Sequence, residues 1–265
     1  MRLNRFLAAA GLGSRRSCED LIASGAVVVN GSRVEKLATT VADEDDVRVH
    51  GRIIKVARPV YLLLNKPRGV VVSKSDERGR KTIYDILPPE YSTLFHVGRL
   101  DKESEGLLIL CNDGELSQKI THPSHSIEKE YEVTLDKPYD PAHSAKLIRG
   151  IFIEGGRGRF ERIHLLGKGR VKVVLRQGIK RQIRLMFYHL GYEVERLKRI
   201  RIGMIRDEAI PSGSYRFLTP LEVKSLQGQK SPAKTSPAAR KPASPRRVVR
   251  KPRSPVAKRE VPARR

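Results

Sequence analysis

The stretch from His96 to Leu110 constrains the fold of this chain more than any other, because it joins a polar loop to a strand that must be buried. Leu107 to Leu110 form an apolar run short enough for such a strand. Gly98 and Gly106 bound the loop before it, and glycine allows backbone conformations that are closed to other residues. A loop of this kind holds a side chain at the rim of a rigid scaffold. Asp101 is thus the candidate catalytic residue of this loop, although for the tetrapeptide Gly-Arg-Leu-Asp alone a solvated turn aspartate is the favoured interpretation.

The charge of the chain indicates a polyanionic partner. The 265 residues contain 53 Lys and Arg against 29 Asp and Glu, which gives a formal net charge of +24. Such an excess favours nucleic acid as the partner. No segment approaches the roughly 18 consecutive apolar residues of a membrane-spanning helix, so we expect no membrane association. Two cysteines, Cys18 and Cys111, form no disulfide framework or metal-ligand spacing and suit a reducing cytoplasm.

Residues 2 to about 57 predict a small domain of two helices and a short sheet. The spacing of Leu3, Phe6, Leu7 and Ala10 indicates an amphipathic helix rather than a targeting segment, and Ser14 is a good N-cap for a second helix. Asn30-Gly31 between β-forming residues predicts a hairpin, and a second strand pair is expected at 47–49 and 53–56. Arg15 and Arg16 lie in the first turn of the second helix, where a bound phosphate would offset their conflict with the helix dipole.

The following residues alternate between strand and helix patterns. Strands are predicted at 61–64, 70–72, 107–110, 129–135, 151–153, 159–166 and 171–175, and helices at 115–120 and 141–149. Ile183, Met186, Phe187 and Leu190 form the apolar stripe of a further helix, which Gly191 ends. The turn at 65–69 and the glycines at 155–158 are interpreted as hairpin turns.

The C-terminal region has the composition of a disordered segment. Residues 228–265 contain 13 Lys and Arg, one acidic residue and 7 Pro, so we expect a disordered basic tail that acts as a nonspecific RNA tether or a solubilising extension.

His122 and His125 lie close together but lack further ligands, so no metal site is predicted. No nucleotide-binding loop is evident either, and no cofactor is expected.

Several separated motifs resemble the bacterial pseudouridine synthases that modify ribosomal RNA. Gly-Arg-Leu-Asp at 98–101, followed after four residues by Gly-Leu-Leu, is similar to their active-site motif. The Lys-Pro-x-Gly turn at 66–69, the Lys-x-Tyr strand at 129–131 and Gln-Gly-x-x-Arg-Gln-Ile-Arg-x-Met at 177–186 also match. The first domain, with Ser14-Arg15-Arg16 and its Val-Asn-Gly hairpin, resembles the S-four-type RNA-binding domain. The resemblance covers about residues 2 to 225.

The resemblance implies an α+β protein in three parts. These are an RNA-binding domain at 1–57, a catalytic domain with a mixed, mainly antiparallel sheet at 60–226, and the tail at 228–265. It also implies that Asp101 is the nucleophile, that Tyr131 lines the uracil pocket, that Arg184 contacts the carboxylate and that Leu197 packs in the same pocket. Core packing explains Leu197 equally well. The residues predicted to bind RNA are all arginines: Arg2, Arg5, Arg15, Arg16, Arg33 and Arg99.

Function is therefore predicted as isomerisation of a uridine in ribosomal RNA, by a monomer, without metal or organic cofactor. The motifs at 129–131 and 181–184 resemble those of family members that modify large-subunit RNA more than those of the small-subunit enzyme. A target in the small-subunit RNA stays the alternative. A noncatalytic RNA-binding factor of ribosome assembly would have the same charge, first domain and tail, but would not need Asp101, Tyr131, Arg184 and Leu197 together. A DNA-binding protein would account for the charge alone.

Overall fold

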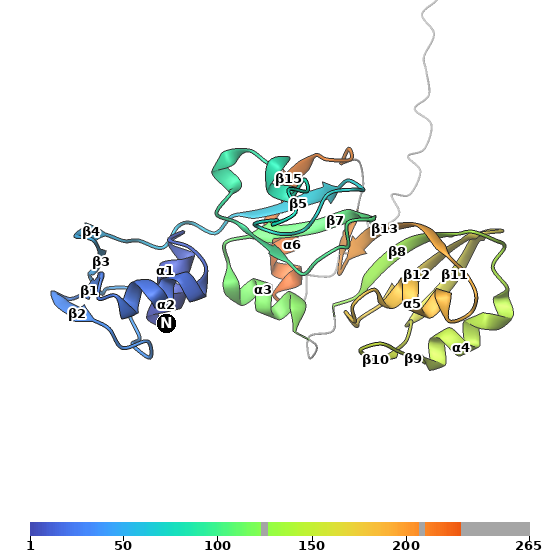
Figure 1. The fold of residues 1–265 in the computed structure, drawn as a ribbon, viewed down its shortest axis with the longest axis horizontal. Coiled ribbons are helices and arrows are strands. Elements are labelled where there is room, and N and C mark those ends of the chain that lie inside the picture. Colours follow the sequence, from blue (N-terminus) through green and yellow to red (C-terminus); the bar gives the residue numbers. More distant parts are fainter. Residues whose placement is uncertain (123–126, 207–209, 229–265) are drawn as a thin grey trace, which may run out of the picture. The chain divides into compact units, whose positions relative to one another are not determined.

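The computed structural model describes residues 1–122, 127–206 and 210–228 and has an α+β fold (Figure 1). Its helices are α1 (Leu3–Ala9), α2 (Arg15–Ala23), α3 (Gly114–Thr121), α4 (Ser144–Arg149), α5 (Gln182–Tyr188) and α6 (Pro220–Leu226). Its strands are β1 (Val27–Val29), β2 (Ser32–Val34), β3 (Val47–Val49), β4 (Arg52–Ile53), β5 (Tyr61–Lys66), β6 (Phe95–Val97), β7 (Ser104–Cys111), β8 (Lys129–Leu135), β9 (Ile151–Ile153), β10 (Gly156–Gly158), β11 (Arg162–Gly167), β12 (Arg170–Leu175), β13 (Val194–Ile202), β14 (Ile205–Arg206) and β15 (Tyr215–Phe217). The predicted tail lies outside the described residues, and none of the helices within them is long and apolar enough to cross a membrane.

The first two helices pack together beside a four-stranded antiparallel sheet of order β2-β1-β3-β4. The Ser14 hydroxyl caps α2 by accepting a hydrogen bond from the Ser17 backbone N–H at 3.1 Å. Asn30 and Gly31 both have positive φ, as the predicted two-residue turn requires. The predictions for this segment are confirmed, except that β4 is shorter than expected. Its apolar residues form a cluster of their own.

A nine-stranded mixed sheet dominates the remainder of the fold. Seven strands follow the order β11-β12-β8-β13-β7-β5-β15, with β14 paired to β13 and β6 to β7. β7 and β13 run parallel to each other, and the other pairs in this sheet are antiparallel. The expected mixed, mainly antiparallel sheet is thus confirmed.

Side-chain alternation along the central strands supplies an apolar layer on each side of the sheet. On β7, Leu108 and Leu110 belong to one buried cluster, while Leu107 and Ile109 belong to another that also contains side chains of α3 and α6. The first cluster includes Met186 and Phe187 of α5. Because β7 is buried on both faces, its sequence is a continuous apolar run rather than an alternating one.

Two turn predictions are wrong in detail. Residues 70–72 do not pair with β5 as a hairpin, and Val71 makes only an isolated bridge to Thr82. The strands that pair with β5 are instead β7 on one side and β15 on the other. The glycines at 156–158 form β10 itself, antiparallel to β9, rather than only a turn.

Gly106 was expected to end the loop before the strand, and this too is wrong. The residue lies inside β7 with φ +103°, directly beside the backbone of β13. A Cβ built on Gly106 would lie 2.2 Å from the carbonyl oxygen of Arg199, far closer than van der Waals contact. Glycine is needed here because two backbones approach closely.

We therefore expect Gly106→Ala to destabilise the protein strongly. The added methyl group must push β13 away from β7 in addition to straining the positive φ, for a loss on the order of 3 kcal/mol or more in the free energy of unfolding. Gly79→Ala is the matched control, because Gly79 has φ +63° but no atom within 4 Å of the built Cβ. It should cost about 1 kcal/mol. Equal losses in urea-unfolding experiments would contradict the close approach.

Candidate active site

A pocket of about 340 Å³ opens where the loop before β7, strands β8 and β13, and the segment leading into α5 meet. Asp101, Tyr131, Arg184 and Leu197, which the sequence motifs predicted, all line it. The strand register explains part of this convergence, since Leu197 is opposite Ser104 of β7 on one side and Val133 of β8 on the other. Residues almost a hundred positions apart in the chain thus lie around one cavity.

The loop that holds Asp101 is hydrogen-bonded to the end of β5 and to the turn that follows β5. The Lys66 side chain is fully buried, and its Nζ donates hydrogen bonds to the carbonyl oxygens of Ser104 (2.6 Å), Pro67 (2.9 Å) and Lys102 (3.3 Å). The backbone N–H of Gly69 donates to the Lys102 carbonyl at 2.8 Å. Burial lowers the pKa of Lys66 to about 8. The Lys-Pro-x-Gly turn therefore fixes the backbone on which Asp101 is carried.

Arg184 approaches this loop from α5. Its Nη1 donates to the Val194 carbonyl at 2.6 Å and its Nη2 to the Glu103 carbonyl at 3.4 Å, while its buried Nε has no partner among the described atoms. Burial lowers the pKa of the guanidinium, and the charge of Asp101 acts in the opposite direction. No ion pair within 4.0 Å joins the two side chains in the described structure, so their direct contact stays a prediction.

Sequence reasoning missed two further cations of the pocket, Lys129 and Arg199. Arg199 is opposite Tyr131 in the β13–β8 register, and its Nη1 lies 3.4 Å from the Tyr131 hydroxyl oxygen. Lys129 precedes Tyr131 by two residues. Burial, and to a smaller extent the nearby charge of Arg199, lower the pKa of Lys129 to about 8. Each cation is two positions from a predicted pocket residue on the same strand. Because side chains at i and i+2 of a strand lie on the same face, this spacing could have predicted both cations.

The arginines predicted to bind RNA lie in two places. Arg15 and Arg16 are exposed in the first turn of α2, while Arg33 on β2 ion-pairs with Glu35 and donates to the Ser24 carbonyl. Arg2 precedes α1 and Arg5 lies on it. Arg99 is exposed at the pocket. Their contacts with RNA stay predictions.

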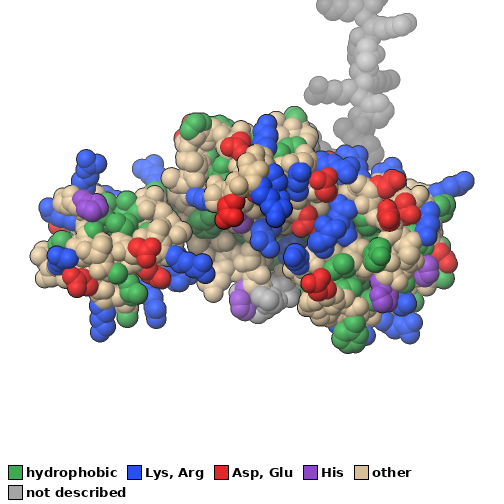
Figure 2. Space-filling view, in the orientation of Figure 1, with side chains coloured by type: hydrophobic (Ala, Val, Ile, Leu, Met, Phe, Trp, Pro, Cys, Tyr) green, Lys and Arg blue, Asp and Glu red, His purple; other side chains and the backbone are tan. Residues whose placement is uncertain are grey.

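Lys180 and Arg181 are also exposed and line the pocket, so its rim is cationic. Figure 2 shows Lys and Arg side chains gathered over β7 and β13 on the face drawn there. Asp101 is the one acidic residue among the described lining residues. The pocket therefore attracts an anionic ligand while it holds a single carboxylate.

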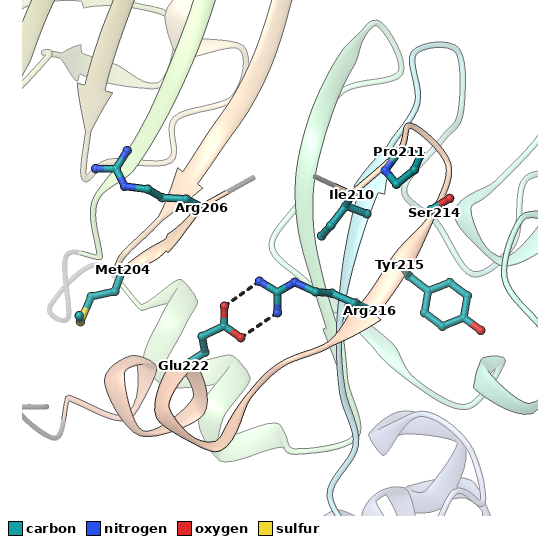
Figure 3. A pocket seen from close by; sticks show the side chains of 8 residues that line it. All are labelled: Met204, Arg206, Ile210, Pro211, Ser214, Tyr215, Arg216 and Glu222. Atoms are coloured by element: carbon teal, nitrogen blue, oxygen red, sulfur yellow. Dashed lines mark hydrogen bonds and ion pairs between the residues drawn. The ribbon is translucent and has the colours of Figure 1, made fainter. Parts of the chain in front are cut away.

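A second hollow, of about 390 Å³, contains none of the predicted site residues. Figure 3 shows Arg216 and Glu222 facing each other in it, with hydrogen bonds of 2.7 and 2.8 Å. Arg216 is therefore already neutralised by a carboxylate. The hollow is similar in size to the Asp101 pocket but lacks a comparable set of titratable and aromatic side chains.

The histidine pair considered as a metal site is only partly described. His122 follows α3, whereas His125 lies outside the described residues. Within the described part of the chain, no three His, Cys, Asp or Glu side chains are grouped as metal ligands would be.

Comparison with known proteins identifies the family. A family model of RNA pseudouridylate synthases matches residues 60–189, and a model of the S4 domain matches residues 1–47. The ribosomal large subunit pseudouridine synthase B of Bacillus subtilis (strain 168) is 37% identical over 232 residues, which span 85% of this chain and 95% of that protein. This chain belongs to the RNA pseudouridylate synthase family.

Two further relatives agree with this assignment. An uncharacterised RNA pseudouridine synthase of Aquifex aeolicus (strain VF5) is 36% identical over 85% of this chain and 93% of its own length. A crystal structure of a pseudouridylate synthase superposes with a TM-score of 0.63 at 32% identity, over 85% of this chain and 99% of that one. The fold and the enzyme class predicted from the sequence motifs are thereby confirmed.

The three hydrogen bonds of Lys66 lead to a prediction for Lys66→Met, which keeps a long side chain but removes the donors. Unpaired buried carbonyls should lower the free energy of unfolding by about 1–3 kcal/mol. The freed loop should also slow pseudouridine formation by roughly tenfold or more, since small displacements of a reactive group are costly. Urea unfolding and single-turnover assays measure the two effects.

Lys102→Met makes the same replacement at an exposed side chain of the loop. It should change the free energy of unfolding by less than about 0.5 kcal/mol. If Lys66→Met behaves like this control in both assays, Lys66 does not fasten the loop.

Proposed function

We propose that this enzyme converts a specific uridine of large-subunit ribosomal RNA to pseudouridine, with Asp101 as the nucleophile. The observation that carries the proposal is the convergence of Asp101, Tyr131, Arg184 and Leu197 on one cationic pocket. The name of the Bacillus subtilis relative supports the large subunit as the target. The motifs at 129–131 and 181–184 favour the same choice.

The reaction requires a group that can assist cleavage of a carbon–nitrogen bond. The base must be detached from the sugar, rotated and rejoined through carbon 5, with no redox change and no input of energy. A carboxylate nucleophile divides such a reaction into easier steps, whether it attacks the sugar or the base or assists departure of uracil. Asp101 is the acidic group that the described pocket offers for this task.

The cations beside Asp101 suit this role. Arg184 lies close enough for the two charges to influence each other. A guanidinium beside a carboxylate attracts its negative charge and can orient it by hydrogen bonds, which suits a positioned nucleophile. On this proposal Arg184 contacts the Asp101 carboxylate during the reaction.

Tyr131 provides a surface for the extruded base. A uridine in structured RNA must leave its stack to enter a pocket, at a cost on the order of a few kcal/mol. Aromatic side chains offset such a cost by stacking on the base. On this proposal the Tyr131 hydroxyl also takes the proton from carbon 5 late in the reaction.

The first domain would supply RNA affinity. We propose a division into an RNA-binding domain at 1–57 and a catalytic domain at 60–226, which the separate apolar cluster of the first segment supports. Arg2, Arg5, Arg15, Arg16 and Arg33 of this domain, and Arg99 at the pocket, would contact RNA phosphates. Phosphate contacts of this kind position a protein on structured RNA. We further propose that the enzyme acts as a monomer in the cytoplasm.

Mapping pseudouridines tests both the target and Asp101. In cells that lack this protein, one pseudouridine of the large-subunit RNA should be missing, and the wild type should restore it. Asp101→Asn removes the charge with little change in size, so it should restore less than about 1% of the modification, in line with loss of an essential nucleophile. Asp43→Asn, a change at an exposed turn aspartate, is the control and should restore it fully.

The outcomes separate the competing functions. A missing site in the small-subunit RNA would move the target there. Restoration by Asp101→Asn would remove the catalytic role of this residue. If every pseudouridine persists in the deleted strain, a noncatalytic role in ribosome assembly takes precedence.

The arginine pair at the start of α2 yields a separate prediction. Replacing both Arg15 and Arg16 by Ala should weaken RNA binding and lower the slope of log affinity against log salt by about 1–2, because each phosphate contact releases counterions. The rate at saturating RNA should be unchanged. Arg48→Ala is the control, since Arg48 already pairs with Asp46 at 2.7 Å. A double variant with the control's affinity and salt slope would show that α2 does not contact phosphate.

A further inference from the structure

Arg199 is a buried cation without a carboxylate partner. It is 3% exposed, and no described carboxylate oxygen lies within 4.0 Å of its guanidinium. Its Nε donates to the Leu107 carbonyl at 2.6 Å and its Nη1 to the Tyr131 hydroxyl at 3.4 Å. Its Nη2 is buried and has no hydrogen-bond partner among the residues that the structure describes. A buried donor left in this state is costly, which indicates that a ligand completes the site.

Arg201, two residues further along β13, shows what a purely structural arginine looks like in this fold. It is also buried, but its Nε donates to Glu130 at 2.5 Å, its Nη2 to Glu128 at 3.1 Å and its Nη1 to the Gly203 carbonyl at 2.7 Å. Arg201 is thus fully paired, and it does not line the Asp101 pocket. Of these two arginines on β13, only Arg199 lines the pocket and keeps a buried donor without a described partner.

The position of Arg199 favours the base, rather than a phosphate, as its ligand. Its guanidinium carbon lies 6.0 Å from the centre of the Tyr131 ring, the surface on which the base is proposed to stack. The exposed cations Arg99, Lys180 and Arg181 form the rim, and exposed cations of this kind suit the phosphates of an RNA backbone that stays outside the pocket. A donor this deeply buried is reached by the part of the nucleotide that enters the pocket.

Uracil has the complementary chemistry. It offers two carbonyl oxygens as hydrogen-bond acceptors, and it becomes negatively charged during the reaction. When the bond between C1′ and N1 breaks, its electron pair leaves with the base. The charge is delocalised over N1 and both carbonyl oxygens until C1′ bonds to carbon 5; N1 then gains a proton and carbon 5 loses one. The reaction therefore remains an isomerisation without a co-reactant.

We propose that Arg199 donates a hydrogen bond from Nη2 to a carbonyl oxygen of the target uracil and stabilises the negative charge of the detached base. This role rests on the proposed pseudouridine synthesis and adds a catalytic residue to it. Lys129, which has no described carboxylate partner and donates only to the Ile127 carbonyl at 3.3 Å, adds positive charge to the same part of the pocket. A fixed donor in a buried site needs no rearrangement as charge develops.

The test compares Arg199→Met with Arg201→Met, two identical replacements of buried arginines on one strand. The substrate is the RNA segment around the uridine that pseudouridine mapping identifies. Arg199→Met should lower the single-turnover rate about 100- to 1000-fold, the effect of removing one such donor. RNA affinity should stay within about threefold, because phosphate contacts dominate it. Arg201→Met should unfold at a lower temperature, yet keep its rate within about threefold where it is folded.

Sulfur substitution in the RNA separates a contact with the base from a structural role. Substrates with 2-thiouridine or 4-thiouridine at the target position replace one carbonyl oxygen by a poorer acceptor. One of the two should slow the wild type by roughly tenfold and leave the residual rate of Arg199→Met unchanged, because the donor is already absent. This measurement on the wild type also stands if Arg199→Met fails to fold.

Three results would overturn the proposal. These are a folded Arg199→Met with a rate within about threefold of the wild type, equal wild-type rates on all three RNAs, or equal slowing of wild type and variant by sulfur. Each rate is compared with the rate of the wild type on the unmodified RNA. A wild type that forms no pseudouridine would instead remove the proposed function itself.

Discussion

The parallel pairing of β7 with β13 is the constraint on which the active site depends. It places Leu197 beside Ser104 and Arg199 beside Gly106, immediately after the loop that holds Asp101. The same strand pairs on its other side with β8, which brings Tyr131 opposite Arg199. Gly106 permits this arrangement because a Cβ there would collide with the Arg199 carbonyl. One backbone contact therefore links strand packing to the composition of the pocket.

Charge is distributed unevenly around this contact, and the distribution separates structural from reactive groups. Glu128 and Glu130 neutralise Arg201 on one part of β13, and Glu222 neutralises Arg216 in the second hollow. In the pocket, by contrast, Lys129, Arg184 and Arg199 have no described carboxylate partner. Cations removed from water are normally paired, so these three side chains together mark the part of the fold that we propose a ligand completes.

The loop between β6 and β7, which carries the proposed nucleophile Asp101, is held through its backbone carbonyl groups in the described structure. Lys66 binds the carbonyl groups on either side of Glu103, and Arg184 binds that of Glu103 itself. These contacts restrain the backbone and leave the Asp101 carboxylate available in the pocket. Such an arrangement suits the proposed role of Asp101, because a nucleophile must be positioned by its surroundings and still be able to form a bond.

The sequence by itself determined the elements with strong local signals and the identity of the motif residues. Ser14, Asn30-Gly31 and the apolar stripe ended by Gly191 act within a few residues, so helix caps, a hairpin and α5 could be predicted. Asp101, Tyr131, Arg184 and Leu197 were found through motif resemblance. Tertiary structure alone decided that they share one pocket, that Gly106 lies under β13 and that Lys66 fastens the loop. It also decided that Arg199 keeps a free donor, while Arg201 does not. These facts depend on strand order and on contacts between distant residues, which no local pattern encodes.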